Sequence, residues 1–365
     1  MRFPEFSGEW ERKTLSEFVD RVTRKNRSLQ STRPLTISAQ YGLVDQTQFF
    51  KKSVAGADLS NYYLLGNGEF AYNKSYSDGY PLGAIKRLDS YDSGVLSSLY
   101  ICFAPKPFIS SDYLVQYFES TKWNKVVKDI SGEGARNHGL LNVSVSGFFE
   151  TQHFIPKKDE QDKLASFLTL IGKRIEVQSK IIEEQETLLK SLADKLISAQ
   201  LANVALCECV EAKASTMKES ELDSSGEFPV YGASGLCGFC SDALEESDSI
   251  LITKDGSGVG TCQYATEKHS FLGTLCSLTA KENVYLPYIY YALLNFNFAS
   301  YKTGQAIPHI YFKDYGKATI YCPSYVEQIR IASGLKKLDA KINADIELLK
   351  QYRLQKEFLL SRMFI

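Results

Sequence analysis

An internal repeat constrains the fold of this chain more than any other feature. The segment EQDKLASFLTLIGKRI at residues 160–175 matches EQIRIASGLKKLDAKI at residues 327–342, a displacement of 167 positions. The same displacement, without a gap, pairs Pro156 with Pro323 and the segment NVSVSGFFETQHFI with HIYFKDYGKATIYC. Self-similarity over a long period indicates that one structural unit occurs twice. Each copy therefore consists of a variable body, a strand, a proline and a long helix.

Both predicted helices carry apolar residues at alternating steps of four and three, which is the coiled-coil period. In the first helix the series runs from residue 164 to Leu196, and the displacement carries it in the same phase to Met363. Gln178 and Asp345 fall at matching positions, where a buried polar group can fix the register. The residues predicted to form the seam are Leu164, Leu168, Ile171, Ile175, Ile331, Leu335, Leu338 and Ile342.

Two arrangements of these helices remain open at this point. Each helix could pack on its own body as an ordinary amphipathic helix, or the two helices could pack on each other. The seams run in phase for about 40 residues, about 60 Å at 1.5 Å per residue, which favours the second arrangement. Since the first helix leads from the first body to the second, the other helix must run back along it. The pair is therefore predicted to be antiparallel.

The predicted fold class is α+β. Two mixed α/β domains are separated by two long antiparallel coiled-coil helices, and the halves are related by a pseudo-two-fold axis. The predicted boundaries are residues 1–155 for the first body, 156–200 for the first spacer helix, 201–322 for the second body and 323–365 for the second spacer helix.

The composition limits the class of protein. The net charge of -1 over 365 residues excludes a protein that binds nucleic acid through bulk positive charge, although local patches remain possible. Most of the 8 cysteines lie in the second half, which is a poor framework for disulfides and indicates a reducing compartment. The N-terminus has no apolar signal region, so the expected location is cytoplasmic, with no membrane association.

Motifs for catalysis are missing from the sequence. It contains no GxxxxGK[ST], HExxH or GxSxG motif, which argues against the common ATPases, zinc proteases and serine hydrolases. It also lacks an Asn-Pro-Pro-Tyr type motif of amino-methyltransferases, so no enzymatic activity and no cofactor is predicted. The run DGSGVG at residues 255–260 fits a tight turn, or a loop that approaches a phosphate beside Lys254.

The cysteines of the second body also allow two interpretations. Cys237 and Cys240 have the spacing of metal ligands, and Cys207 and Cys209 lie upstream. In the apolar context YGASGLCGFC, however, these thiols are expected to act as small hydrophobic side chains, so no metal site is predicted.

Basic and polar residues gather in several segments that are predicted to be loops. Residues 12–33 hold seven basic and two acidic residues, which fits either a solvated face or a segment that follows a phosphate backbone while amides read bases. The second body is acidic, so its candidates are fewer. The candidate DNA-binding residues are Arg21, Arg24, Lys25, Asn26, Arg27, Asn73, Lys74, Tyr76, Arg136, Asn137, His138, Lys254, Ser257, Lys302, Thr303, Gln305 and His309.

The sequence resembles the DNA specificity subunits of type I restriction–modification systems. The opening RFPEFSGEWE is similar to that family's N-terminus, and AYNKSYSDGYPLGAIKRLDSYDSGVLSSLYICF with EGARNHGLLNVS is similar to one of its first target-recognition domains. FPVYGASGLCGF with ILITKDGSGVGT resembles a second domain of that kind, and the two proline-to-helix junctions resemble its repeated regions.

The resemblance implies a non-catalytic subunit that reads a bipartite, asymmetric sequence in double-stranded DNA with two target-recognition domains. It further implies that the helices are a platform for two modification (adenine methyltransferase) subunits, which restriction (translocase/endonuclease) subunits then join. Two other hypotheses remain: a coiled-coil adaptor whose bodies bind proteins without reading DNA, and a nuclease. The nuclease lacks a Pro-Asp followed by Glu-x-Lys in this sequence.

Overall fold

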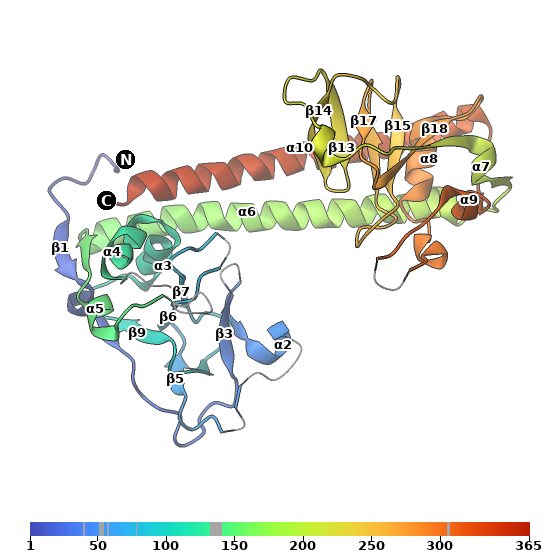
Figure 1. Cartoon of the computed structure of the whole chain (residues 1–365). Helices are drawn as coiled ribbons and strands as arrows, with labels where there is room; N and C mark the ends of the chain where they lie inside the picture. The colour runs from blue at the N-terminus through green and yellow to red at the C-terminus, as the bar shows by residue number, and fades with distance from the viewer. Residues whose placement is uncertain (39–40, 51–54, 57, 78, 132–140, 305–306) are drawn as a thin grey trace. The chain divides into compact units, whose positions relative to one another are not determined.

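The computed structural model describes residues 1–38, 41–50, 55–56, 58–77, 79–131, 141–304 and 307–365 (Figure 1). These residues form two compact units. The first unit contains residues 1–177 and 349–365, and the second contains residues 178–348. Each unit therefore holds one mixed body together with a stretch of each long helix.

The first unit contains short antiparallel sheets. Its largest sheet has four strands in the order β2-β9-β6-β7, and two-stranded ladders join β1 to β10, β3 to β4 and β5 to β8. The strands are β1 Glu11–Thr14, β2 Val19–Arg21, β3 Leu35–Ser38, β4 Gly42–Asp45, β5 Tyr63–Gly66, β6 Phe70–Asn73, β7 Ala84–Arg87, β8 Ser93–Leu96, β9 Ile101–Pro105 and β10 Gln152–Ile155. The helices of this body are α1 Leu15–Phe18, α2 Gln46–Phe50, α3 Ser111–Glu119, α4 Lys122–Ile130 and α5 Val145–Phe149.

An aromatic core joins the four-stranded sheet to the helices of the first unit. The rings of Phe70 and Phe103 stack with their centroids 5.4 Å apart, and Tyr72 stacks on Phe148 of α5 at 4.9 Å. Such offset aromatic pairs add to the free energy gained by burying their large apolar area. The start of α6 and the end of α10 contribute to the same buried cluster through Leu164, Leu168, Leu359, Met363 and Phe364.

The second unit repeats this mixed character with different sheets. A four-stranded antiparallel sheet has the order β12-β18-β15-β16, and a three-stranded sheet, β14-β13-β17, contains one parallel pair. The strands are β11 Val204–Ala205, β12 Val210–Ala214, β13 Phe228–Gly232, β14 Gly235–Cys240, β15 Ser249–Thr253, β16 Cys262–Ala265, β17 Ser270–Phe271, β18 Leu275–Ala280 and β19 Thr319–Ile320. The helices are α7 Leu206–Cys209, α8 Leu286–Leu293 and α9 Phe312–Tyr315, with 3-10 turns at Glu219–Glu221 and Phe298–Tyr301.

The internal repeat is visible in the order of elements. The first body begins β1-α1-β2 and ends α5-β10, and the second begins β11-α7-β12 and ends α9-β19. Helix α5 begins at Val145 and α9 at Phe312, which are equivalent residues under the displacement of 167. In both bodies the closing strand pairs antiparallel with the opening strand. The chain thus returns to the base of each body before the proline that precedes the long helix.

In each body, a buried glutamine of the long helix bonds to the start of a shorter helix, which is α3 in the first body and α8 in the second. The Oε1 of Gln161 accepts from the Ser110 N–H at 2.8 Å, and its Nε2 donates to the Pro156 carbonyl at 2.9 Å. Gln328, the equivalent residue, accepts from the Tyr285 N–H at 2.8 Å and donates to the Pro323 carbonyl at 2.9 Å. Ser110 and Tyr285 are the residues before α3 and α8, so the glutamines satisfy backbone groups that a helix start leaves unpaired.

The two long helices are α6, Lys158–Ala193, and α10, Tyr325–Met363. In the first unit the guanidinium of Arg174 lies 4.4 Å from the ring centroid of Tyr352. In the second unit the Nε2 of Gln185 donates to Asp345 at 3.0 Å. In the first unit Gly172 also lies beside Lys356, so α6 and α10 run in opposite directions there and the helices are antiparallel. The predicted fold class is confirmed.

The predicted apolar series is wrong at its last position in the first helix. Leu196 is 40% exposed, whereas Ile197 is 2% exposed and occupies the buried position. The buried positions after Leu189 are Ala193, which is 0% exposed, and Ile197, so the buried face has already moved by one residue where the π-helical turn at Asp194–Ser198 begins. The eight predicted seam residues are all buried or half-buried.

A polar layer interrupts the apolar contact between the helices in the second unit. Asp345 is 4% exposed, and Lys341 donates to both of its carboxylate oxygens at 2.6 and 2.7 Å. Hydrogen bonds from Lys341 and then Gln185 lower the pKa of Asp345. Gln178 also faces this carboxylate. Equivalent positions of the repeat therefore meet at this layer, which supplies the kind of polar contact that specifies register.

None of the helices formed by the described residues is both long enough and apolar enough to cross a membrane.

Candidate nucleic-acid interface

The basic segment of the first body divides into paired and unpaired cations. Arg24 makes a bidentate ion pair with Glu69, with one N–O distance of 2.8 Å, and Lys25 lies 3.7 Å from the ring centroid of Tyr63. Arg21 and Arg27 are exposed, and neither side chain makes an ion pair or hydrogen bond with the described residues. Of the candidate DNA-binding residues in this segment, Arg21 and Arg27 are therefore free to contact a phosphate.

The prediction that Asn26 contacts DNA is wrong. Its side chain is 0% exposed, its Nδ2 donates to the Ser31 carbonyl at 2.7 Å, and its Oδ1 accepts from the Ser31 N–H at 3.1 Å. Because both ends of the amide are used to close the loop, Asn26 has neither the exposure nor a free group for a base edge. The two bonds fix the backbone of the loop that contains Arg27.

A second candidate segment of the first body follows β6. The Oδ1 of Asn73 accepts from the Ser75 N–H at 3.1 Å, and Lys74 donates to the Val143 carbonyl at 3.3 Å. Tyr76 is 61% exposed and has a free ring face for stacking or groove contacts. The predicted residues Arg136, Asn137 and His138 lie outside the described residues.

In the second body, backbone hydrogen bonds bring two distant candidate loops together. The Gly256 N–H donates to the Pro308 carbonyl at 3.0 Å, and the Ile310 N–H donates to the Lys254 carbonyl at 2.9 Å. Thr303 and His309 exchange backbone bonds at 2.9 and 2.8 Å, which closes the second loop. Lys254, Ser257, Thr303 and His309 are therefore presented by one joined pair of loops.

An aspartate–histidine pair lies where these loops meet. The Nδ1–H of His309 donates to the Oδ1 of Asp255 at 2.6 Å. A carboxylate at Nδ1 fixes the proton on that nitrogen, so Nε2 of the neutral ring is left as an acceptor. His309 is about one-third exposed. The pair can thus present an oriented acceptor to a base edge or a water molecule.

The backbone turn at residue 304 depends on glycine. Gly304 has a φ of +84°, and a Cβ at this position would lie 2.4 Å from the Ile307 carbonyl oxygen. The turn leaves Lys302 and Thr303 exposed, and Ser257 is exposed on the neighbouring loop. The predicted residue Gln305 lies outside the described residues. Of the two candidate lysines in this body, Lys254 lies 3.8 Å from Asp255, whereas Lys302 makes no ion pair with the residues that the structure describes.

The structure describes no metal site among the candidate cysteines and histidines. Cys237 and Cys240 lie in β14, where Cys240 is buried and its thiol contacts the Asp242 carbonyl at 3.0 Å. Within the part of the chain that the structure describes, no group of three or more His, Cys, Asp or Glu side chains could hold a metal ion. His153 and His269 are core residues, and burial lowers the pKa of His153 to about 4.

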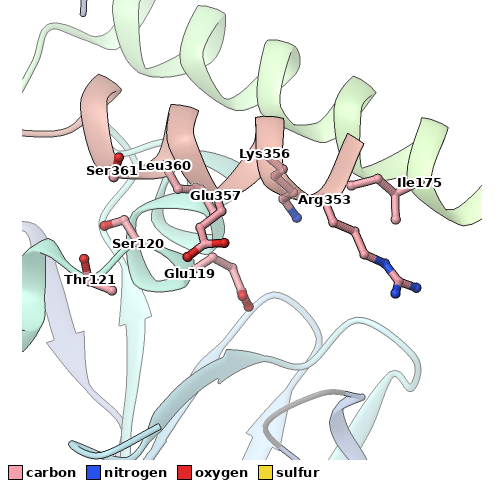
Figure 2. Close-up of a pocket in the computed structure, with 9 residues that line it drawn as sticks. All are labelled: Glu119, Ser120, Thr121, Ile175, Arg353, Lys356, Glu357, Leu360 and Ser361. Atoms are coloured by element: carbon pink, nitrogen blue, oxygen red, sulfur yellow. The ribbon is translucent and has the colours of Figure 1, made fainter. Parts of the chain in front are cut away.

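A groove of about 380 Å³ lies between α10, α6 and the α3–α4 connection in the first unit (Figure 2). Arg353, Lys356 and Glu357 reach it from α10, and Ile175 reaches it from α6. Figure 2 shows Glu119 and Glu357 extending toward the same part of the groove. The groove therefore combines an apolar floor with cations and carboxylates.

The second unit contains an equivalent groove of about 490 Å³. Ile342 and Leu189 line it, and they are the repeat equivalents of Ile175 and Lys356 in the first groove. Glu186 stands at the position equivalent to Arg353, and Lys190 at the position equivalent to Glu357. The two grooves thus share their place in the fold, but the signs of these charges are exchanged.

Comparisons with known proteins identify the class to which this fold belongs. The whole chain is similar to the crystal structure of a type I restriction–modification S subunit from M. genitalium, with a TM-score of 0.63, 18% identity and coverage of 100% of this chain and 99% of that chain. A chain from a structure concerned with complex assembly and conformational transition of the type I restriction–modification system gives a TM-score of 0.58 with 14% identity, over 98% and 97% of the two chains. These two similarities show the fold.

Sequence comparisons specify the family further. Residues 203–351 match the family model of the type I restriction modification DNA specificity domain. A relative from Mycoplasma genitalium, named as a type I specificity subunit, is 24% identical over 248 residues, or 62% of this chain. The match spans 64% of that relative's length. The resemblance to specificity subunits is confirmed.

Two functional features were missed by the sequence analysis. Asp255 follows Lys254 directly, but its pairing with His309 depends on two loops that are far apart in sequence. Gln161 and Gln328 are identities of the repeat, and that identity was the available signal for their shared role at the base of each body.

Proposed function

We propose that this chain is the non-catalytic DNA sequence-specificity subunit of a type I restriction–modification complex. In this proposal it reads a bipartite, asymmetric site in double-stranded DNA, and residues 1–155 and 201–322 are its two target-recognition domains. The observation that carries the proposal is the specificity-domain match at residues 203–351. The repeated order of elements at the base of the first body extends the argument to the other half of the chain.

The two bodies would read different half-sites because their loops differ. The first body offers Arg21, Arg27 and Tyr76, and the second offers Ser257, Lys302 and the Asp255–His309 pair. Exposed cations can bind phosphates and position the protein, whereas hydroxyl, imidazole and ring groups can contact base edges. The acidic second body would depend more on such directed contacts than on charge.

Exposed apolar side chains on the long helices support a role as a platform for other subunits. In the first unit Leu170 is 65% exposed and Phe358 is 51% exposed, and in the second unit Leu188 is 50% exposed. Large apolar residues on a helix surface are typical of interfaces with partners. We infer that two modification (adenine methyltransferase) subunits cover these faces and the two equivalent grooves, and that restriction subunits join them.

The length of the helices would limit the gap between the half-sites. Helix α6 contains 36 residues, which corresponds to about 54 Å at 1.5 Å per residue. At about 3.4 Å per base pair this length spans at most about 16 base pairs, and the width of the bodies reduces the unread part. Half-site spacing would follow helix length, as it follows subunit separation in dimeric readers.

Methylation mapping tests the proposal. The chain is expressed with its modification subunits in a host that lacks adenine methylation, and methylated adenines are located by sequencing. A single split motif is expected. The double substitution Ser257→Ala with Lys302→Ala should weaken one half of the motif, and Arg27→Ala with Tyr76→Ala should weaken the other. Uniform methylation, or no methylation with a soluble complex, would contradict the proposal.

Salt dependence separates this function from that of a protein-binding adaptor. DNA binding by the complex should fall steeply as salt rises, because bound phosphates release counterions. An adaptor without DNA readout would retain its partners and show no such DNA binding.

A further inference from the structure

Two cysteines meet where the second body joins α10. Cys209 is the last residue of α7, and Cys322 lies between β19 and Pro323. Antiparallel pairing of β11 with β19 brings these segments together. The Asn203 side chain fixes the backbone of Cys322, because its Oδ1 accepts from the Cys322 N–H at 2.8 Å and its Nδ2 donates to the Cys322 carbonyl at 3.0 Å. The two thiols are in hydrogen-bonding contact, and both are free.

The same place in the first body is apolar. Phe18 is the last residue of α1, as Cys209 is of α7, and Ile155 is the repeat equivalent of Cys322. Phe18 and Ile155 both belong to the buried hydrophobic cluster of that body. The fold therefore requires only two packed apolar groups at this junction, so packing alone does not account for two adjacent thiols in the second body.

The surroundings make the two thiols unequal. The Nε2 of Gln328 lies 3.4 Å from the Sγ of Cys322, and the Cys209 thiol donates to the same sulfur, which lowers the pKa of Cys322 to about 7. Cys322 is half-buried and reachable from solvent, whereas Cys209 is 2% exposed. The interaction with Cys322 and burial raise the pKa of Cys209. One sulfur is thus a nucleophile and the other is held beside it as a thiol.

We propose that Cys209 and Cys322 form a reversible disulfide when the chain meets hydrogen peroxide. The Cys322 thiolate attacks one peroxide oxygen, the O–O bond breaks, and the other oxygen leaves as water after protonation, which gives the Cys322 sulfenic acid. The Cys209 sulfur then attacks the Cys322 sulfur, the S–O bond breaks, and a second water leaves with the Cys209 proton. Peroxide is reduced, and the two thiols are oxidised to a disulfide. A thiol reductant reverses the reaction.

The disulfide would close a covalent loop of roughly 100 residues around the second body. It would join the first turn of that body to the strand that leads into α10. Since a loop of this size restricts the unfolded chain, the oxidised protein should unfold at a higher temperature, by at least about 4 °C.

Peptide mapping of the full chain tests this proposal without DNA. The reduced protein is treated with hydrogen peroxide, the remaining thiols are alkylated, and the non-reduced digest is analysed by mass spectrometry. The expected product is the Cys209–Cys322 cross-linked peptide, which disappears on reduction. Cys209→Ser should instead leave a Cys322 sulfenic acid that dimedone traps, and Cys322→Ser should abolish both products.

Cys237→Ser is the matched control, because Cys237 is an exposed thiol in another part of the same body. This variant should form the Cys209–Cys322 bond at the rate of the unmodified chain. The proposal is overturned if the folded chain links Cys207 to Cys322, if Cys237 is the main site of oxidation, or if the bond forms only after denaturation. None of these results would affect the proposed DNA readout, which is measured separately.

Discussion

The equivalent glutamines at the bases of the two bodies give a prediction with a matched internal control. Gln161→Ala removes the acceptor of the Ser110 N–H and the donor to the Pro156 carbonyl, and Gln161 is 2% exposed. A net hydrogen bond contributes about 1 kcal/mol, and a buried backbone group left without a partner costs about 1–3 kcal/mol. The expected loss of stability is therefore about 2–4 kcal/mol.

The loss should be local to the first unit. Ser110 is the residue before α3, so the substitution should increase the rate at which the start of α3 opens. A loss of about 2 kcal/mol corresponds to roughly 30-fold faster amide exchange when reclosing is faster than exchange, because the exchange rate then follows the opening equilibrium. Hydrogen–deuterium exchange of peptides covering residues 108–118 measures this rate directly.

Gln328→Ala is the matched variant. It should accelerate exchange at the start of α8, residues 284–293, and leave the start of α3 unchanged. Gln30→Ala, at an exposed position, should alter neither peptide. Equal acceleration of both helices by Gln161→Ala, or unchanged exchange at Ser110, would refute the assignment of the glutamines as local joints between helix and body.

Three further predictions concern pH, readout and assembly. Burial lowers the pKa of His153 to about 4 in the folded chain, against about 6.5 in the unfolded chain. The unfolded chain therefore binds the extra proton, and the free energy of unfolding should fall by up to about 3 kcal/mol as the pH drops from 6.5 to 4. Urea unfolding of the unmodified chain and of His153→Gln at several pH values measures this fall, and equal pH slopes for the two proteins would contradict the prediction. Asp255→Asn removes the carboxylate that holds the proton on Nδ1 of His309, and it should reduce the discrimination between bases at one half-site of the methylated motif by about 1–3 kcal/mol. Asp314→Asn, at an exposed carboxylate, should leave this discrimination unchanged. A change in the other half-site would count against the assignment. Arg353→Glu should weaken the binding of one modification subunit by about 5-fold, as measured by native mass spectrometry of the complex, and leave the other subunit bound; equal loss of both subunits would argue against two separate grooves.

The helices and their direction could be predicted from the sequence because their signal is periodic. Apolar residues at heptad spacing identify the buried face, and the connection between the copies leaves the antiparallel direction as the one that satisfies both seams. The π-helical turn at Asp194–Ser198 could not be predicted, because no residue in that segment is specific for an i→i+5 bond. The shift of the buried face from Leu192 to Ala193 and from Leu196 to Ile197 was therefore not predicted either.

The interface was less predictable because it depends on contacts between segments that are distant in sequence. The run of cations around Arg24 gives no sign that Glu69, many residues later, neutralises it. Asn26 has the amide side chain expected of a residue that reads bases, but this amide bonds to the backbone of its own loop. Such local bonding to the backbone is common for asparagine. The Asp255–His309 pair likewise requires the two loops of the second body to be adjacent.

The two copies of the repeat show which positions have to remain the same and which are free to differ. Gln161 and Gln328 keep the same pair of hydrogen bonds, because each must satisfy a helix start and a proline carbonyl in the same geometry. The grooves differ in the signs of their charges, and the junction changes from Phe18 and Ile155 to two thiols. A pair of bodies that share their attachment but differ in their loops can contact two different half-sites from the same helical support. Equivalent substitutions at the two attachments should therefore destabilise their own copies by similar amounts. On the proposed function, substitutions in the loops should change the readout of one half-site only.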